Sequence, residues 1–227
     1  MTNPVTPLLT IKGLQFNGNT AAKPLLEILS LSIQAGDRIS LQGGSGAGKS
    51  LLLRSITQLE KVDKGEFIWK GKDLQKIDMP LYRSHVIYLH QLPALGAGSV
   101  ADSLQQVFKL KTHKGKQYSE LIITNFLTEI GLNTAFLQKN IQNLSGGEAQ
   151  ITALLRAIQL QPEILLLDEP TAALDAEKSA AIEKIVACWF AEATDSRAYI
   201  WVTHNPAQAA RVSNKVWKME QGRLTIA

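Results

Sequence analysis

The sequence predicts an α/β protein with a mainly parallel sheet, and three patterns support this fold class. The second half alternates short apolar runs with longer amphipathic runs, as strands and helices do around a parallel sheet. Residues 164–167 are apolar throughout, which is typical of a strand covered on both faces. The first third instead has short runs between glycine-containing turns, and these indicate antiparallel hairpins.

The composition favours one sizeable domain. The chain has 227 residues, of which 45% are hydrophobic and 19% charged, so it can bury a core without disulfides. Its one cysteine, Cys188, cannot form an internal disulfide. The formal net charge is +4, and the densest basic cluster comprises Lys109, Lys111, Lys114 and Lys116. This cluster indicates a solvated loop, with anionic lipid or nucleic acid as alternative partners.

The first half is divided by turn signals into strands and one helix. We expect strands at residues 8–16, 29–33, 38–42, 67–69 and 85–89, and a helix that begins at residue 51. Glycine-containing turns separate these segments at residues 17–19, 35–37, 64–66 and 70–72. The break after residue 89 is a polar pair followed by Pro93.

The second half begins with a helical region. Residues 100–140 have a helical pattern interrupted by the lysine-rich segment, and Gly131 is a helix C-cap signal. Ser145 and Glu148 form a capping-box pattern that opens a helix to about residue 160. After it we expect a strand at 164–167, a helix at 175–192, a strand at 199–203, a short helix from 205 and a hairpin at 216–226.

One stretch fits the phosphate-binding pattern G-x-x-x-x-G-K-[ST], and it reads Gly43-Gly44-Ser45-Gly46-Ala47-Gly48-Lys49-Ser50. Small residues let the backbone wrap a phosphate, and the N-terminus of the following helix adds partial positive charge. Lys49 would then reach the β- and γ-phosphates, while the Ser50 hydroxyl would ligate Mg²⁺. A plain glycine-rich turn is the alternative, but the flanking strand and helix signals and the Lys-Ser pair disfavour it.

Two further polar groups follow predicted strands. Asp168 and Glu169 come directly after an apolar strand, and His204 follows the next one. Ligands of parallel sheets bind beyond the carboxyl ends of the strands, so these groups and the phosphate-binding loop are expected at one edge. Asp168 would hold Mg²⁺ through water, and Glu169 would orient the attacking water or accept its proton. The alternatives are a helix cap with a surface carboxylate, and a structural histidine at a strand end.

Taken in order, these motifs resemble the ATP-binding-cassette (ABC) ATPases over nearly the whole chain. The order is the phosphate-binding loop, Gln91, Leu144-Ser145-Gly146-Gly147-Glu148, Asp168-Glu169, Ala172-Ala173-Leu174-Asp175 and His204. The resemblance implies the P-loop NTPase fold of ABC ATPases, with an N-terminal antiparallel β subdomain and an α-helical subdomain. It also implies one nucleotide-binding domain over residues 1–227, with the helical subdomain inserted at about 92–160.

The resemblance also implies roles for individual residues. Two copies would pair head to tail around two ATP molecules, with the signature residues Ser145, Gly146, Gly147 and Glu148 acting in trans. ATP would be held by Phe16 on the adenine and by Gly43, Gly44, Ser45, Gly46, Ala47, Gly48, Lys49, Ser50 and Leu51. Mg²⁺ would be held by Ser50, Gln91 and Asp168. Glu169 would be the catalytic base, and His204 would contact the γ-phosphate. Gln91 would couple the nucleotide site to the transmembrane subunit, and Asp175 would carry the loop that links the two sites across the dimer.

Three positions depart from the family pattern. Ile151 stands where the family usually has Arg, so a polar contact on the signature helix is lost. Leu51 replaces the usual Thr, which leaves a backbone N–H but no hydroxyl for phosphate. Phe16 is the candidate for the adenine-stacking aromatic, and an alignment shifted within the glycine turn would place Gly18 there instead.

The resemblance favours an ATP-hydrolysing subunit that drives a separate transmembrane permease from the cytoplasmic face of the membrane. No run approaches the roughly 20 apolar residues that span a bilayer, and the N-terminus has no signal-peptide pattern. Small bacterial exporters, including iron or metal exporters, are the most similar subtype, while amino-acid, lipoprotein-release and phosphate-uptake ATPases stay open. The alternatives are a soluble ATP-driven clamp on nucleic acid, ribosome or division machinery, and a non-hydrolysing nucleotide-binding module. No nucleic-acid partner is expected.

Overall fold

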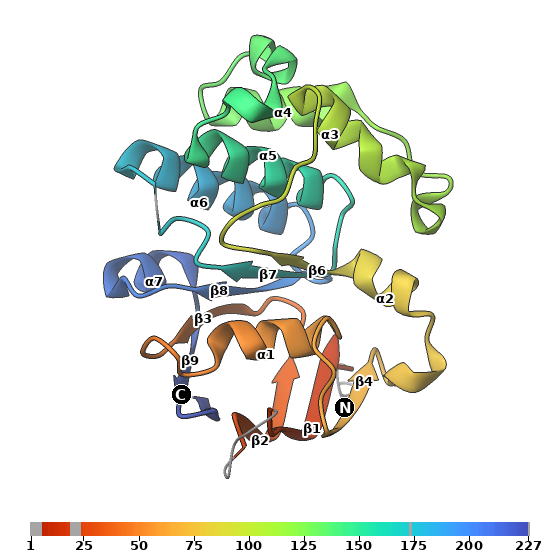
Figure 1. Cartoon of the computed structure of the whole chain (residues 1–227), viewed down its shortest axis with the longest axis vertical. Coiled ribbons are helices and arrows are strands. Elements are labelled where there is room, and N and C mark those ends of the chain that lie inside the picture. Colours follow the sequence, from red (N-terminus) through yellow and green to blue (C-terminus); the bar gives the residue numbers. More distant parts are fainter. Residues whose placement is uncertain (1–5, 19–23, 173, 227) are drawn as a thin grey trace. The chain divides into compact units, whose positions relative to one another are not determined.

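The structure is a computed structural model that describes residues 6–18, 24–172 and 174–226 (Figure 1). The chain divides into two compact units. The first unit comprises Met1–Tyr88, Glu163–Asp168 and Ala193–Ala227, and the second comprises Leu89–Pro162 and Glu169–Glu192. None of the described helices is long and apolar enough to cross a membrane.

The first unit contains a four-stranded antiparallel sheet in the order β2-β1-β4-β5. Its strands are β1 (Leu9–Phe16), β2 (Leu26–Ile33), β4 (Lys64–Trp69) and β5 (Lys72–Asp73). This confirms the hairpins predicted for the first third of the chain. β2 begins three residues earlier than expected, because Leu26 pairs with Phe16 and extends the ladder.

The first unit also holds most of a six-stranded sheet in the order β10-β9-β3-β8-β7-β6. Its strands are β3 (Arg38–Gln42), β6 (Val86–Leu89), β7 (Ile164–Asp168), β8 (Ala198–Val202), β9 (Lys215–Glu220) and β10 (Arg223–Ile226). The pairs β3–β8, β3–β9 and β7–β8 are parallel, and the β9–β10 hairpin is antiparallel. Every residue of β7 and β8 is buried, as expected for strands covered on both faces.

The described part of the first unit also contains α-helices (Figure 1). They are α1 (Lys49–Ile56), which packs against β7, α2 (Met79–His85) and α7 (Pro206–Val212). The helix α2 was not predicted, and the prediction that His85 lies in a strand is wrong, because His85 is the last residue of α2. The helix has only 7 residues, too few for a helical period to show, and it begins at a proline-containing turn rather than a side-chain cap.

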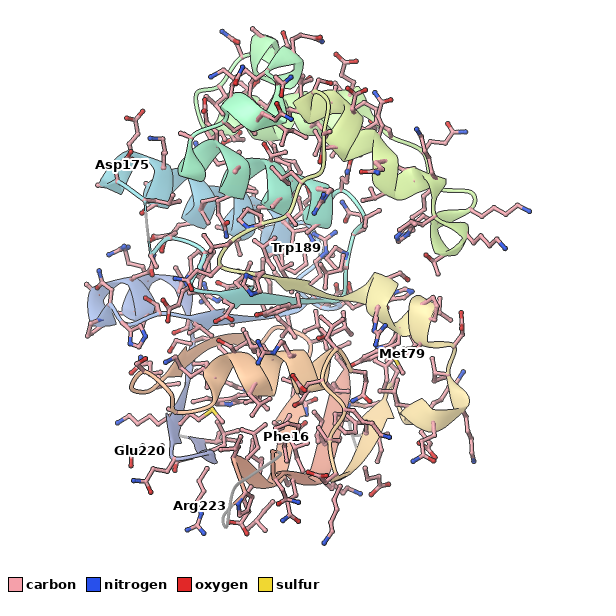
Figure 2. All side chains as sticks on the ribbon, viewed as in Figure 1. Phe16, Met79, Asp175, Trp189, Glu220 and Arg223 are labelled. Atoms are coloured by element: carbon pink, nitrogen blue, oxygen red, sulfur yellow. The ribbon has the colours of Figure 1, made fainter. Side chains whose placement is uncertain are left out.

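The second unit is helical, which confirms the predicted pattern. It contains α3 (Val100–Gln106), α4 (Glu120–Glu129), α5 (Gly146–Ile158) and α6 (Ala176–Ala191), with short 3₁₀ turns between them. α5 packs against α3 and α6, and α4 packs against α6 (Figure 1). Gly131 follows α4 with φ +75°, the left-handed conformation expected of a C-terminal glycine. The core of the unit includes the fully buried side chain of Trp189 (Figure 2).

Candidate functional site

The phosphate-binding loop joins β3 to α1 within the first unit, in the strand–loop–helix order that its sequence predicted. Gly43 has φ +156°, and a Cβ there would lie 2.3 Å from the carbonyl oxygen of Met219, so only glycine fits. The loop is closed by a hydrogen bond from Ala47 N–H to Gly44 O at 3.2 Å. The Ala47 carbonyl in turn accepts a hydrogen bond from Gly222 N–H at 3.0 Å, so the β9–β10 hairpin supports the loop.

Lys49 is folded over this loop. Its Nζ donates hydrogen bonds to the carbonyl oxygens of Gly43 at 2.8 Å and Gly44 at 2.9 Å, and the residue is only 6% exposed. A buried ammonium needs such partners, because desolvating an unpaired charge is costly. The positive charge is therefore held at the loop, where it would attract an anion such as phosphate.

The start of α1 offers backbone donors and a hydroxyl. The first backbone bond of the helix is donated by Leu52 N–H to Gly48 O at 2.8 Å, so the N–H groups of Lys49, Ser50 and Leu51 have no partner within the helix. Such a helix start attracts anions. Ser50 is half-buried, and its hydroxyl has no hydrogen-bond partner among the described residues. Ser45 and Gly46 are exposed at the tip of the loop.

Asp168 ends β7 and is 5% exposed. Its Oδ2 accepts a hydrogen bond of 2.7 Å from the hydroxyl of Tyr88, which lies on the neighbouring strand β6. Within the described residues, Oδ1 accepts no hydrogen bond. Burial, and then the bond and charge of Asp168, raise the pKa of Tyr88, so its hydroxyl stays protonated as a donor at neutral pH.

These groups fit a magnesium ion. Carboxylate and hydroxyl oxygens are the ligands that Mg²⁺ prefers, and it usually binds through one or two carboxylates, water and the phosphates of its substrate. Asp168 Oδ1 and the Ser50 hydroxyl supply this kind of donor set, on two elements of the first unit that pack together. Their chemistry fits Mg²⁺, and the assignment of Ser50 and Asp168 as its ligands stays a prediction.

His204 is exposed in the turn after β8. The turn is fixed by the 6% exposed Thr203, whose hydroxyl donates to Gln208 Oε1 at 2.7 Å and accepts from Asn205 N–H at 3.1 Å. Asn205 caps α7 by accepting from Gln208 N–H at 3.1 Å. These bonds hold the backbone on both sides of His204.

Phe16 ends β1 and is partly buried against the core of the first unit (Figure 2). Its carbonyl oxygen accepts a hydrogen bond of 2.7 Å from Leu25 N–H, which closes the turn between β1 and β2. Residues 19–23 of this turn lie outside the described residues. A Cβ on Gly18 would lie 2.8 Å from the Leu25 side chain. The choice between Phe16 and Gly18 at the adenine stays a prediction.

The signature residues begin α5 in the second unit, with the capping box that the sequence predicted. Ser145 N–H donates to Glu148 Oε2 at 2.9 Å, and Glu148 N–H donates to Ser145 Oγ at 3.3 Å. Lys139 Nζ donates to the other Glu148 oxygen at 2.5 Å, and this bond, with the one from Ser145 N–H, lowers the pKa of Glu148. Gly146 and Ser145 are exposed at the helix start, where backbone N–H groups attract anions.

Lys178 links the signature to the aspartate at the start of α6. Its Nζ pairs with Asp175 Oδ2 at 2.6 Å, while Asp175 Oδ1 caps α6 by accepting from Lys178 N–H at 2.8 Å. A Cβ on Gly147 would overlap the Lys178 side chain, so Lys178 lies directly against the signature backbone. The labelled Asp175 marks the N-terminal end of α6 in Figure 2.

Two further candidates occupy loops of the second unit. Glu169 follows β7 with φ +49°, a conformation that costs a non-glycine residue about 1–3 kcal/mol and that is often found at functional sites. Its carbonyl accepts from Ala172 N–H at 3.2 Å. Gln91 is exposed in the turn after β6.

Ile151, one of the departures from the family pattern, lies on α5 and is only 4% exposed. Its apolar side chain therefore belongs to the core.

A family model described as ABC transporter matches residues 26–172, well over half of the chain. The chain therefore belongs to the ABC transporter family, and its fold is that of the ATP-binding cassette. The resemblance found in the motifs is confirmed.

Curated relatives and solved structures agree with this assignment. The chain is 32% identical over 200 residues to the probable iron export ATP-binding protein FetA of Escherichia coli, covering 88% of this chain and 86% of the relative. It is 33% identical over 215 residues to the phosphate import ATP-binding protein PstB of Saccharolobus solfataricus, covering 89% and 81%. A dimeric ATP-binding cassette solved with ADP and phosphate superposes with TM-score 0.78 at 23% identity, covering 95% of this chain and 96% of that one.

Sequence reasoning missed Tyr88, Lys178 and Lys139 as neighbours of candidate residues. A signal for Tyr88 was available, because its hydroxyl is the one polar side-chain group in the strand Val86–Leu89 and needs a partner when buried. No sequence pattern predicts the contacts of Lys178 and Lys139, because surface lysines are common and their partners depend on how the helices pack.

Proposed function

We propose that this chain binds and hydrolyses ATP to drive a separate membrane permease. The observation that carries the proposal is the set of groups around the phosphate-binding loop. The Lys49 ammonium is held at the loop, N–H groups with no partner within the helix begin α1, and the Asp168 carboxylate ends a strand of the same unit. Together they supply the cation, backbone donors and carboxylate that phosphoryl transfer requires.

In this proposal the phosphates of ATP bind in the loop and accept hydrogen bonds from groups that include the Lys49 ammonium, which now donates to the loop backbone. Lys49 exchanges carbonyl oxygens for phosphate oxygens, and the N–H groups of Ser50 and Leu51 donate to the same anion. Ser50, Asp168 and Gln91 would hold Mg²⁺, which supplies charge neutralisation at the phosphates when bound. The missing hydroxyl at Leu51 removes one phosphate contact.

Glu169 would orient the attacking water and accept its proton. Its left-handed backbone fixes the direction in which the side chain leaves the end of β7. His204, held by the Thr203 turn, would donate to the γ-phosphate as negative charge develops there. Gln91 would report the state of the nucleotide to the permease.

The signature residues would act on ATP bound by a second copy of the chain. Ser145 and Gly146 are exposed at the N-terminus of α5, where a γ-phosphate would meet free N–H groups and the positive end of the helix dipole. Asp175 would carry the loop that connects the two sites of the dimer. ATP would then hold a head-to-tail dimer closed, and hydrolysis would open it.

For the transported substance we propose a metal ion, with iron export as the specific case. The support is the similarity to FetA, whose name describes probable iron export. A phosphate import protein is similar at comparable identity, so the experiment identifies the permease and the substance that it transports.

The proposal is tested by a mild-detergent pull-down of the tagged chain from its native cells. A multi-span integral protein recovered in stoichiometric amount is expected, and a metal-transport activity of the reconstituted pair would support export of a metal. Recovery of the chain without any integral protein would contradict the transporter role. ATP hydrolysis stimulated by DNA or ribosomes would then favour the ATP-driven clamp.

A further inference from the structure

Three buried or half-buried tyrosines of the first unit differ in what their hydroxyls bind. Tyr82 donates to the backbone carbonyl of Ile56 at 2.7 Å, and Tyr199 donates to that of Val212. Both bonds fasten one element to another inside the core. Tyr88 instead donates to a side-chain carboxylate, that of Asp168, at 2.7 Å. Its hydroxyl is thus directed at a candidate functional group rather than at the scaffold.

The bond restricts how the carboxylate of Asp168 can turn. A carboxylate at the end of a strand can rotate about its last side-chain torsion, which has a broad energy well. The bond from Tyr88 occupies Oδ2, and no described residue donates to Oδ1. Because Asp168 is only 5% exposed, water competes little with this bond. The hydroxyl of Tyr88 therefore selects which oxygen remains available to a metal ion.

We propose that Tyr88 is the positioning residue for Asp168, which it holds with one carboxylate oxygen available to the magnesium ion of the bound nucleotide. The inference rests on the proposed function, because it requires that the site bind Mg²⁺ with ATP. Groups that hydrogen-bond to metal-ligating side chains typically change metal affinity or activity by about 10–100-fold when removed. In this role Tyr88 acts on the metal ion through Asp168 and is not itself a ligand.

The experiment uses Tyr88→Phe in the full chain, a change that removes only the hydroxyl. Binding of a non-hydrolysable ATP analogue is measured by calorimetry, once in EDTA and once across a Mg²⁺ titration. We expect unchanged affinity in EDTA and an approximately tenfold or greater rise in the Mg²⁺ concentration that gives half-maximal enhancement of binding. Thermal unfolding of each variant is recorded alongside.

Tyr82→Phe is the matched control, because it removes a hydroxyl that bonds to backbone in the same unit. We expect it to lower the unfolding temperature while leaving the Mg²⁺ requirement as in the unmodified chain. A second test uses Asp168→Asn, on which background Tyr88→Phe should add no further change in the Mg²⁺ requirement. This double-mutant cycle isolates the Tyr88–Asp168 coupling from general effects on folding.

Each result decides the proposal. An unchanged Mg²⁺ requirement in Tyr88→Phe would overturn it, and so would an equal loss of affinity with and without Mg²⁺. A further change on the Asp168→Asn background would likewise overturn it. If the unmodified chain binds no nucleotide at all, the proposed function itself fails. If that chain binds with Mg²⁺ and only the Tyr88→Phe expectation fails, the proposed function stands without this inference.

Discussion

The guanidinium of Arg156 donates a hydrogen bond of 3.0 Å to the carbonyl oxygen of Ala94. Arg156 lies on α5, the helix that begins with the signature residues, and Ala94 follows Gln91 by three residues. The same guanidinium donates to Ser103 Oγ on α3 at 3.5 Å, and burial lowers its pKa. One side chain of the second unit thus connects the signature helix to the segment that leads from Gln91 into α3.

Replacing Arg156 by Met should destabilise the chain by about 1.5–3 kcal/mol. The change keeps an apolar stem but removes a half-buried charged donor, which bonds to the Ala94 carbonyl and to the hydroxyl of the buried Ser103. The measurement is urea unfolding followed by circular dichroism. Arg223→Met is the control, since Arg223 is exposed and its pair with Glu27 should contribute only about 0–1 kcal/mol. Equal effects of the two changes would contradict the prediction.

Replacing Lys49 by Ala should lower the affinity for ATP at least tenfold. The ammonium is the one charged side chain bonded to the phosphate-binding loop among the described residues, and a charge-assisted hydrogen bond contributes about 1.5–3 kcal/mol. Calorimetric titration with ATP measures the effect. Lys218→Ala, an exposed lysine on β9, should leave the affinity unchanged. ATP binding by Lys49→Ala at the strength of the unmodified chain would refute the phosphate role.

Replacing Ser145 by Asp separates the cap of α5 from its proposed contact with phosphate. Asp is as good an N-cap as Ser, so the unfolding temperature should stay nearly the same. A carboxylate facing the γ-phosphate of the other copy should repel it, and ATP hydrolysis should fall by about 100-fold or more. The rate of phosphate release measures this, with Ser119→Asp at the cap of α4 as the control. Unaltered hydrolysis by Ser145→Asp would argue against action in trans.

The carboxylate of Glu163 should make part of the stability of the first unit depend on pH. Burial raises the pKa of Glu163. The interactions with His85 Nδ1 at 3.3 Å and Lys70 Nζ at 2.8 Å lower it by more, so the net shift of the pKa is downward. A lowered pKa means that this contribution is present above the unfolded value of about 4.3 and is lost as the pH falls through the folded value.

Glu163→Gln should therefore cost roughly 1 kcal/mol at pH 7 and much less near pH 3. Urea unfolding of both proteins at the two pH values measures the difference. Glu66→Gln, an exposed carboxylate on β4, is expected to have little effect at either pH. A cost of Glu163→Gln that stays constant between pH 7 and pH 3 would contradict the assignment.

The type and start of a helix or strand could be predicted from the sequence where a local pattern determines them. The capping box of Ser145 and Glu148 fixed the start of α5, and the four apolar residues before Asp168 fixed β7. The helix α2 was missed because one short turn of helix leaves no period. The early start of β2 was missed because its first pair, Leu26 with Phe16, is a contact between strands.

The candidate residues themselves were predictable from motifs, but their neighbours were not. Tyr88 meets Asp168 because β6 lies beside β7, and the chain between these strands is 74 residues long, from Leu89 to Ile164, with no local pattern that sets their order. Lys178 meets the signature backbone because α6 packs against α5. Such contacts depend on tertiary packing, which local sequence patterns do not encode.

We propose that this chain hydrolyses ATP with Glu169 as the catalytic base, and phosphate release by Glu169→Gln is the first measurement to make. We expect this variant to bind ATP, to release almost no phosphate and to accumulate as a dimer in light scattering with ATP present. Glu66→Gln should hydrolyse ATP as the unmodified chain does. Phosphate release by Glu169→Gln at the rate of the unmodified chain would show that Glu169 is not the catalytic base.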